Sequence, residues 1–165
     1  MLPFEAGIAA GADVVMTAHI TTPNATTDGL PASLSYTMIT ERLRGELGFQ
    51  GVIVTDALEM DAIQKHFTPE QAAVAALGAG VDVLLMPSDL RAAFDGVVRA
   101  VEDGTLSEEC LNESVRRVLT LKQKAGLELS GSSEGKQSVP EETSDIKCSF
   151  ANWLKKLCYG ADTAA

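Results

Sequence analysis

Three short apolar runs, each close after a glycine, alternate with helical segments over residues 1–127. The runs are rich in Val, Ile and Leu and are too short for helices, which is typical of fully buried strands. We expect strands at residues 14–18, 52–55 and 81–86. Strands that alternate with helices at this spacing indicate right-handed βαβ units and a parallel sheet. The sequence therefore predicts an α/β fold.

Helical patterns separate and follow the expected strands, over residues 4–10, 36–47, 57–65, 69 to 78 or 80, 89–103 and 108–125. The best-defined start has Thr68 as the cap, Pro69 at the first helical position and Gln71 placed to complete a capping box. Three strands are too few to close a barrel or to cover both faces of a sheet well, so the pattern indicates part of a larger fold. The other expected capping residues are Ser35, Ser88 and Ser107.

The acidic composition limits the classes of partner. With 13 Lys and Arg against 23 Asp and Glu, the chain has a net charge of −10, which argues against binding nucleic acid or an anionic membrane surface through bulk electrostatics. The apolar runs are far too short to span a bilayer. The first residues lack the charged region and long apolar core of a signal peptide, and the compartment stays unassigned.

The three cysteines, Cys110, Cys148 and Cys158, are widely scattered. They have neither the spacing of a metal site nor that of a disulfide framework, and we expect no metal ion or other cofactor. Cys110 falls in a helical pattern, where we expect it to serve as a packing residue.

The sequence changes character after residue 127. Residues 128–148, which contain many Ser and Gly, predict a flexible linker. Residues 149–165 predict a short amphipathic tail that packs back on the body of the protein, because apolar residues recur there at helical spacing, at Phe150, Trp153, Leu154 and Leu157.

An acidic residue, Asp56, follows directly on the second expected strand. The carboxyl ends of buried parallel strands are where α/β proteins place their chemistry, so Asp56 is a candidate catalytic carboxylate. Asp is also a favoured residue at the start of a helix. From the local pattern, a helix cap and a catalytic group remain equal alternatives for Asp56.

His19 stands at the C-terminal end of the first expected strand, facing the presumed pocket, and Asp56 stands at the same end of the second. His19 either lines a ligand pocket, as a substrate-binding residue, or is a structural histidine bonded to the neighbouring backbone. Asp13 and Asp82 lie at the start of their strands, at the opposite end of the sheet, where we expect no catalytic role. His66 lies in a loop and is expected to be solvated.

Four segments of the sequence together resemble glycoside hydrolase family 3, and most closely its bacterial β-N-acetylhexosaminidases, the β-N-acetylglucosaminidase type. The resemblance covers about residues 2–127, keeps the motifs in order, and rests mainly on the segment around Asp56. The segments are GADVVMTAH (11–19), LPASLS (30–35), LGFQGVIVTDALEM (47–60) and AGVDVLLMP (79–87).

This resemblance implies that residues 1–127 are the C-terminal part of a (β/α)₈ TIM barrel, about three βα units whose strands are the last three of the eight. It also implies a retaining mechanism, in which a carboxylate attacks the anomeric carbon and forms a covalent glycosyl-enzyme. Asp56 matches the family's nucleophile. The implied substrate is a glycan that contains β-linked N-acetylglucosamine.

The resemblance also implies a general acid/base, a His paired with an Asp, on a loop after the fifth strand of the barrel. That loop would precede residue 1, so we do not assign the acid to His19 or His66. We therefore expect a fragment that is weakly active or inactive alone and that self-associates through unpaired strand edges. The alternative is a small non-enzymatic α/β binding or interaction module, in which Asp56 only caps a helix.

Overall fold

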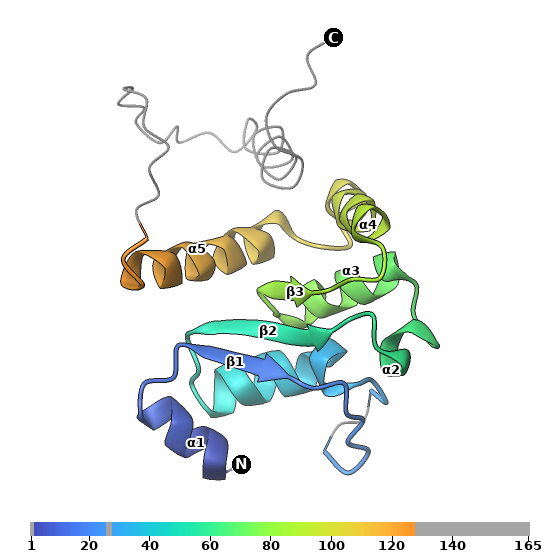
Figure 1. Ribbon diagram of the computed structural model, residues 1–165. Helices are drawn as coiled ribbons and strands as arrows, with labels where there is room; N and C mark the ends of the chain where they lie inside the picture. The colour runs from blue at the N-terminus through green and yellow to red at the C-terminus, as the bar shows by residue number, and fades with distance from the viewer. Residues whose placement is uncertain (1, 26–27, 128–165) are drawn as a thin grey trace, which may run out of the picture. The chain divides into compact units, whose positions relative to one another are not determined.

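The computed structural model describes residues 2–25 and 28–127, which form a three-stranded parallel sheet with helices between the strands (Figure 1). The strands β1 (Val14–Thr17), β2 (Val52–Ala57) and β3 (Val83–Leu85) lie in the order β1-β2-β3. β1 and β2 pair in register from Val14 opposite Val52 to Thr17 opposite Thr55. The predicted parallel α/β arrangement is confirmed. The predicted linker and tail, residues 128–148 and 149–165, lie outside the described residues.

The helices follow the predicted order, with differences in length. α1 (Leu2–Ala9) precedes β1, and η1 (Ala32–Leu34) and η2 (Thr37–Glu46) connect β1 to β2. Between β2 and β3 lie α2 (Asp61–Gln64) and α3 (Pro69–Ala79). After β3 come α4 (Leu90–Glu102) and α5 (Glu108–Lys124). The predicted helix over residues 57–65 is wrong, because Ala57 still belongs to β2 and α2 is a single turn. η2 is a π-helix, in which the Leu47 N–H donates to the Arg42 carbonyl five residues earlier.

The local capping predictions have mixed outcomes. The capping box is confirmed, since the Gln71 N–H donates to Thr68 Oγ1 and the Thr68 N–H donates to Gln71 Oε1. Ser107 caps α5 as predicted. The prediction for Ser88 is wrong, because Asp89 caps α4 and accepts a hydrogen bond from the Ala92 N–H (2.9 Å). The Ser35 hydroxyl accepts from the Met38 N–H (3.3 Å), close to the predicted helix start.

The core lies on the side of the sheet that η2 and α3 cover. Ile53 and Thr55 of β2 are fully buried there. The buried residues of α3 are mostly alanines, whose small side chains allow close packing. Where α3 and α4 meet, a Cβ added at Gly96 of α4 would lie 2.6 Å from the Cβ of Glu70 of α3, so this contact requires glycine. The buried residues of the cluster are Leu34, Ile39, Leu43, Phe49, Ile53, Leu58, Ile63, Ala72, Ala76, Ala79 and Val81.

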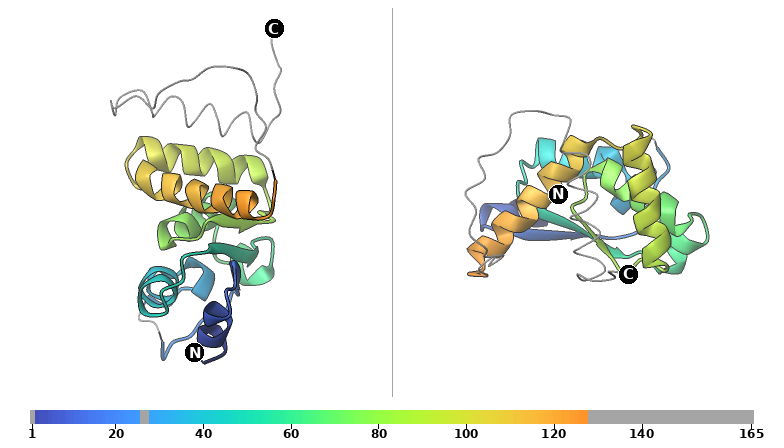
Figure 2. Two further views of the ribbon diagram at one scale, coloured as in Figure 1. Left: turned by 90° about the vertical axis from the view of Figure 1, so that its left-hand side faces the viewer. Right: turned by 90° about the horizontal axis from the view of Figure 1, so that it is seen from above.

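The other side of the sheet is only partly covered by the described residues. Alternation along β1 places Val14 and Met16 on this side, opposite Val52 and Val54 of β2. Val14 is 45% exposed and Met16 is 56% exposed. The views in Figure 2 show β1 as the outer strand of the sheet, with β2 as its only neighbour among the described strands. One side of the sheet is therefore covered by helices, and the other is apolar and partly exposed among the described residues.

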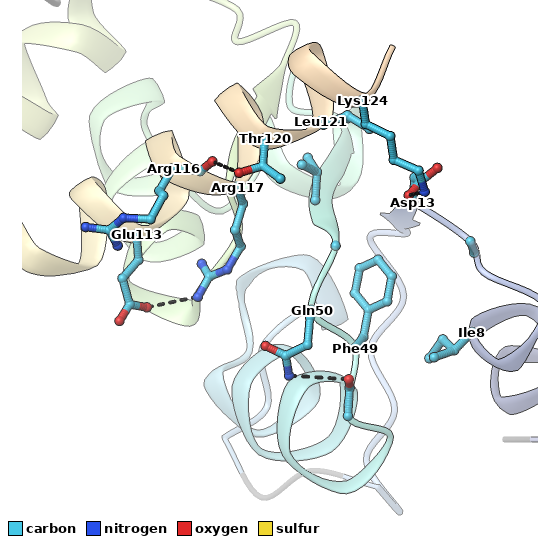
Figure 3. Close-up of a pocket in the computed structure, with 14 residues that line it drawn as sticks. Ile8, Asp13, Phe49, Gln50, Glu113, Arg116, Arg117, Thr120, Leu121 and Lys124 are labelled. Atoms are coloured by element: carbon cyan, nitrogen blue, oxygen red, sulfur yellow. Dashed lines mark hydrogen bonds and ion pairs between the residues drawn. The ribbon is translucent and has the colours of Figure 1, made fainter. Parts of the chain in front are cut away.

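A cavity of about 640 Å³ opens at the amino ends of β1 and β2, beside α5 (Figure 3). Four of the charged side chains that line it form two ion pairs. Lys124 of α5 donates to Asp13 (2.5 Å), and Arg117 donates to Glu113 (2.9 Å). The Lys124–Asp13 pair joins α5 to the residue before β1, whereas the Arg117–Glu113 pair lies within α5.

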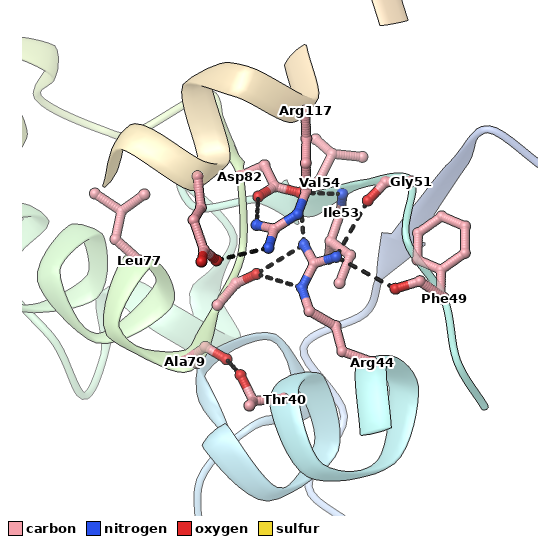
Figure 4. A network of polar contacts seen from close by, with 12 residues as sticks. Thr40, Arg44, Phe49, Gly51, Ile53, Val54, Leu77, Ala79, Asp82 and Arg117 are labelled. Carbon is pink, nitrogen blue, oxygen red and sulfur yellow. Dashed lines mark hydrogen bonds and ion pairs between the residues drawn. The ribbon is translucent and has the colours of Figure 1, made fainter. Parts of the chain in front are cut away.

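Next to this cavity, the buried Asp82 carboxylate binds two guanidinium groups (Figure 4). Asp82 Oδ2 accepts from Arg44 Nη2 (2.7 Å) and from the Ile53 N–H (2.8 Å), and Oδ1 accepts from Arg117 Nη1 (3.0 Å). Arg44 also donates to the carbonyls of Gly80 and Gly51. Burial lowers the pKa of the Arg44 guanidinium, and the charge of Asp82 opposes this effect. The contacts join η2, β2, α5 and the start of β3.

Replacement of this buried carboxylate is expected to destabilise the fold strongly. In Asp82→Ala, two guanidinium groups and one N–H lose their acceptor, and the loss of one partner from a buried ion pair costs about 3–5 kcal/mol. Asp61→Ala is the matched control, because Asp61 pairs with Lys65 on the surface, where the side chains are 80% and 67% exposed. The control should change stability by less than about 0.5 kcal/mol. Urea unfolding monitored by circular dichroism measures both, and equal effects would contradict the assigned role of Asp82.

Candidate active site

Asp56 is the penultimate residue of β2, at the carboxyl end of the sheet. Its Oδ1 accepts a hydrogen bond from the N–H of the next residue, Ala57 (2.8 Å). The following helix, α2, begins only at Asp61 and has Met60 at its cap position. The interpretation of Asp56 as a helix cap is therefore wrong. The other alternative, a catalytic carboxylate at Asp56, stays a prediction.

The alternation of β2 determines the side of the sheet to which Asp56 belongs. Ile53 and Thr55 are fully buried on the helix-covered side, so Val54 and Asp56 belong to the opposite, open side. Asp56 is half-buried there. The carboxylate thus shares the open face of the sheet with the apolar residues Val14 and Met16 of β1.

His19 follows β1 and reaches across to the end of β2. Its Nε2 lies 3.0 Å from the Ala57 carbonyl oxygen, and its Nδ1 lies 2.6 Å from Ser33 Oγ. A carbonyl oxygen can only accept, so Nε2 must carry the proton of this hydrogen bond, and in the neutral ring Nδ1 accepts from the Ser33 hydroxyl. Both ring nitrogens are engaged by the protein itself. This geometry favours the structural alternative for His19 over direct binding of substrate.

The residues that follow Asp56 are attached to the end of β3. The Leu58 N–H donates to the Leu85 carbonyl (2.9 Å), and the Glu59 N–H donates to the Met86 carbonyl (3.0 Å). The Thr55 hydroxyl oxygen accepts from the Leu85 N–H (3.0 Å). Met86 has a φ of 45°, an uncommon value for a residue with a side chain. The backbone around Asp56 is thereby fixed on the side of β3.

The other residues considered from the sequence lie away from Asp56. Asp13 and Asp82 lie at the amino ends of β1 and β3 and make the ion pairs described above. His66 is exposed after α2. Among residues 2–25 and 28–127, no cluster of three His, Cys, Asp or Glu side chains could hold a metal ion. In the same two ranges, no helix has both the length and the apolar character needed to cross a bilayer.

Cys110 packs between helices, as predicted. Its thiol donates to the Leu77 carbonyl (3.5 Å), and burial raises its pKa. A raised pKa keeps the group protonated, and the thiolate is the reactive form. The structure therefore gives no support for a cysteine nucleophile at this position.

The sequence of this chain matches a described family. Residues 1–121 match the model of the glycosyl hydrolase family 3 N terminal domain. The chain belongs to glycosyl hydrolase family 3. Among its family 3 relatives, beta-hexosaminidase A of Pseudoalteromonas piscicida is 38% identical over 144 residues, which are 75% of this chain and 24% of that protein. The beta-N-acetylglucosaminidase/beta-glucosidase of Cellulomonas fimi is 32% identical over 133 residues, 75% of this chain and 24% of that protein.

Solved structures agree with this family membership. The glycoside hydrolase family 3 beta-N-acetylglucosaminidase from Paenibacillus sp. str. FPU-7 superposes with a TM-score of 0.74 at 40% identity, over 93% of this chain and 30% of that one. For the beta-N-acetylglucosaminidase from Thermotoga maritima the TM-score is 0.66 at 33% identity, over 72% and 27%. The predicted fold is confirmed: the sheet and its helices are a portion of a TIM barrel. The chain spans about a quarter to a third of the length of these relatives.

The half-buried thiol of Cys110 gives a direct test of the packing around α5. Alkylation of Cys110 by iodoacetamide in the folded chain should be much slower than in urea, and its rate should rise at a higher pH than that of a free cysteine, because the raised pKa delays formation of the thiolate. Peptide mapping by mass spectrometry follows Cys110 separately from the other cysteines. Equal rates in the folded and the unfolded chain would contradict the assigned packing.

Proposed function

We propose that this chain carries the nucleophile, Asp56, of a retaining glycoside hydrolase that removes terminal β-linked N-acetylhexosamine. The main observation is the position of Asp56 at the carboxyl end of β2, on the open face of the sheet, with one oxygen bonded to the Ala57 N–H. TIM barrels place their catalytic residues at this end of their strands. The beta-hexosaminidase and beta-N-acetylglucosaminidase names of the relatives support the sugar class. We extend this proposal to glycans derived from peptidoglycan.

In the proposed reaction Asp56 acts first as a nucleophile. A carboxylate oxygen, which we assign as Oδ2 because Oδ1 is held by Ala57, bonds to the anomeric carbon as the bond to the leaving oxygen breaks. A general acid protonates the leaving oxygen. The same group, now a base, takes a proton from water, which attacks the anomeric carbon and releases the Asp56 carboxylate. Two inversions at one carbon retain the configuration.

The general acid/base in this proposal comes from outside residues 1–165. His19 bonds to the strand that carries Asp56, and both of its ring nitrogens already have protein partners. The loss of general acid–base assistance slows a reaction by about 10²–10⁴-fold. We therefore propose that the chain alone is weakly active or inactive, and that it needs the first five βα units of a barrel.

The decisive experiment is the hydrolysis of an aryl β-N-acetylglucosaminide. The chain is assayed alone and mixed with a separately produced N-terminal barrel portion of a close relative. We expect activity only in the mixture, and a loss of about 10³-fold or more with Asp56→Asn, because an amide is a far weaker nucleophile than a carboxylate. Asp61→Asn, which removes an exposed carboxylate on α2, should leave the rate unchanged.

The other outcomes of this assay have distinct meanings. Activity of the chain alone would contradict the proposed absence of a general acid. No activity in either sample, from a folded monomer, would contradict the enzymatic proposal and favour a non-enzymatic α/β binding module. The binding-module alternative assumed that Asp56 caps a helix, and the cap position of α2 is Met60 instead.

We also propose that the isolated chain self-associates through the outer edge of β1. This edge strand has two half-exposed apolar side chains, Val14 and Met16, on the open face of the sheet, and it contains neither a proline nor a charged residue. Edge strands of this kind pair readily with other chains, and an edge lysine opposes such pairing.

A lysine on this edge is therefore expected to weaken self-association. Met16→Lys should raise the dissociation constant by about tenfold or more, which corresponds to about 1.4 kcal/mol. Gln50→Lys adds the same charge at an exposed position outside the strands and serves as the matched control. Sedimentation velocity over a concentration series measures both variants. An equal shift for the two lysines would indicate general charge repulsion and would contradict pairing at the β1 edge.

A further inference from the structure

The end of β2 extends beyond its pairing with β1. The last pair of residues is Thr17 opposite Thr55, so Asp56 and Ala57 have no backbone partner on β1. On the other side, the register between β2 and β3 is irregular between Val54 and Ala57. Beyond this irregularity Ala57 pairs with Leu85 of β3, so it is only on the β1 side that Asp56 and Ala57 lack a regular strand partner.

The side chain of His19 occupies the place of the absent strand partner. Its Nε2–H donates to the Ala57 carbonyl (3.0 Å), which also accepts from the Met60 N–H (3.1 Å), so both lone pairs of this oxygen are used. The N–H of the same residue donates to Asp56 Oδ1 (2.8 Å). Ala57 is thus held at its carbonyl by His19 and at its amide by the carboxylate.

We infer that His19 is a positioning residue for Asp56, acting through Ala57 and not through substrate. The inference rests on the proposed function of Asp56. It goes beyond that proposal because it assigns the histidine a defined tautomer and a defined role, in which it keeps the Ala57 N–H directed at Oδ1 so that the attacking oxygen keeps its direction. A displacement of about 1 Å in a catalytic group can cost about 10²-fold in rate.

The Ala57 carbonyl, which can only accept, requires the Nε2–H tautomer, and Ser33 supplies a hydroxyl that can donate to the remaining nitrogen, Nδ1. Ser33 lies in η1, is fully buried, and places its hydroxyl 2.6 Å from Nδ1. When the hydroxyl donates to Nδ1, the proton of the neutral ring must be on Nε2, where the Ala57 carbonyl needs it. η1 is itself tied to the end of β1, because the Ala32 N–H donates to the Ile20 carbonyl (2.9 Å). η1 therefore helps to hold His19 in place through Ser33.

Two amide variants of His19 separate the positioning role from a general structural role. In His19→Gln the side-chain N–H₂ reaches about as far as Nε2 and can still donate to the Ala57 carbonyl. In His19→Asn the amide reaches only about as far as Nδ1 and keeps at most the contact with Ser33. The two variants are similar in polarity and differ in the one hydrogen bond that the inference requires.

The first readout is nuclear magnetic resonance of the full chain. We expect the ring-nitrogen shifts of wild-type His19 to show the Nε2–H tautomer. The Ala57 amide proton should have the downfield shift of a hydrogen bond to a carboxylate, keep it in His19→Gln, and lose it in His19→Asn. An Nδ1–H tautomer, or the same Ala57 shift in both variants, would overturn the inference. This readout does not depend on catalysis.

The second readout is the kinetics of the mixture with the N-terminal barrel portion. We expect kcat to fall about 10- to 10²-fold in His19→Asn and to recover in His19→Gln, with KM changed by less than about twofold, because positioning acts on the transition state. A rise in KM alone would overturn the inference and make His19 a substrate ligand. His66→Asn is the control at an exposed histidine. If the wild-type mixture is inactive, the proposed function fails, and the resonance data still decide whether His19 holds Ala57.

Discussion

The buried Asp82 carboxylate is the constraint on which the arrangement of the other elements depends. A buried charge is stable only when it is paired and hydrogen-bonded. Asp82 forms ion pairs with two guanidinium groups and accepts a hydrogen bond from the Ile53 N–H. The donors come from η2, α5 and β2, so none of these elements can move without breaking a contact with this buried carboxylate. Because Ile53 and Asp56 belong to the same strand, this network at the amino end also sets the position of the candidate site at the carboxyl end.

The two sides of the sheet explain why this chain is a portion of a barrel. The helix-covered side has a closed core of alanine and branched residues, in which Ile53, Ala73 and Val81 are fully buried. The other side leaves Val14 and Met16 about half exposed to solvent. In a complete barrel that side is the packed interior. The family match over residues 1–121 and the superposition on family 3 structures agree with this interpretation.

Patterns of neighbouring residues were enough to predict the helices, strands and two of the caps. The end of β2 and the partners of His19 depend on contacts between residues far apart in the sequence. The capping box at Thr68 and the cap at Ser107 involve residues three positions apart, so the sequence alone was sufficient. The extension of β2 through Ala57 depends on hydrogen bonds to Leu85 and to His19, which no local pattern contains. The partnership of His19 with Ser33 was missed for the same reason. Its only signal in the sequence is a serine near the end of the loop that follows β1.

The described structure also indicates which part of the proposed chemistry is local to this chain. The carboxylate of Asp56 is directed by Ala57, and Ala57 by His19 and by the turn to Met60, all within residues 19–60. The open face beside Asp56 has only β1 and β3 as walls among the described strands, so a sugar bound there would still be in contact with water. Water weakens the electrostatic interactions that stabilise an oxocarbenium-like transition state. In the proposed reaction the remaining strands of a barrel would therefore contribute the exclusion of water as well as the general acid, while this chain contributes the hydrogen bond from the Ala57 N–H to Asp56 Oδ1.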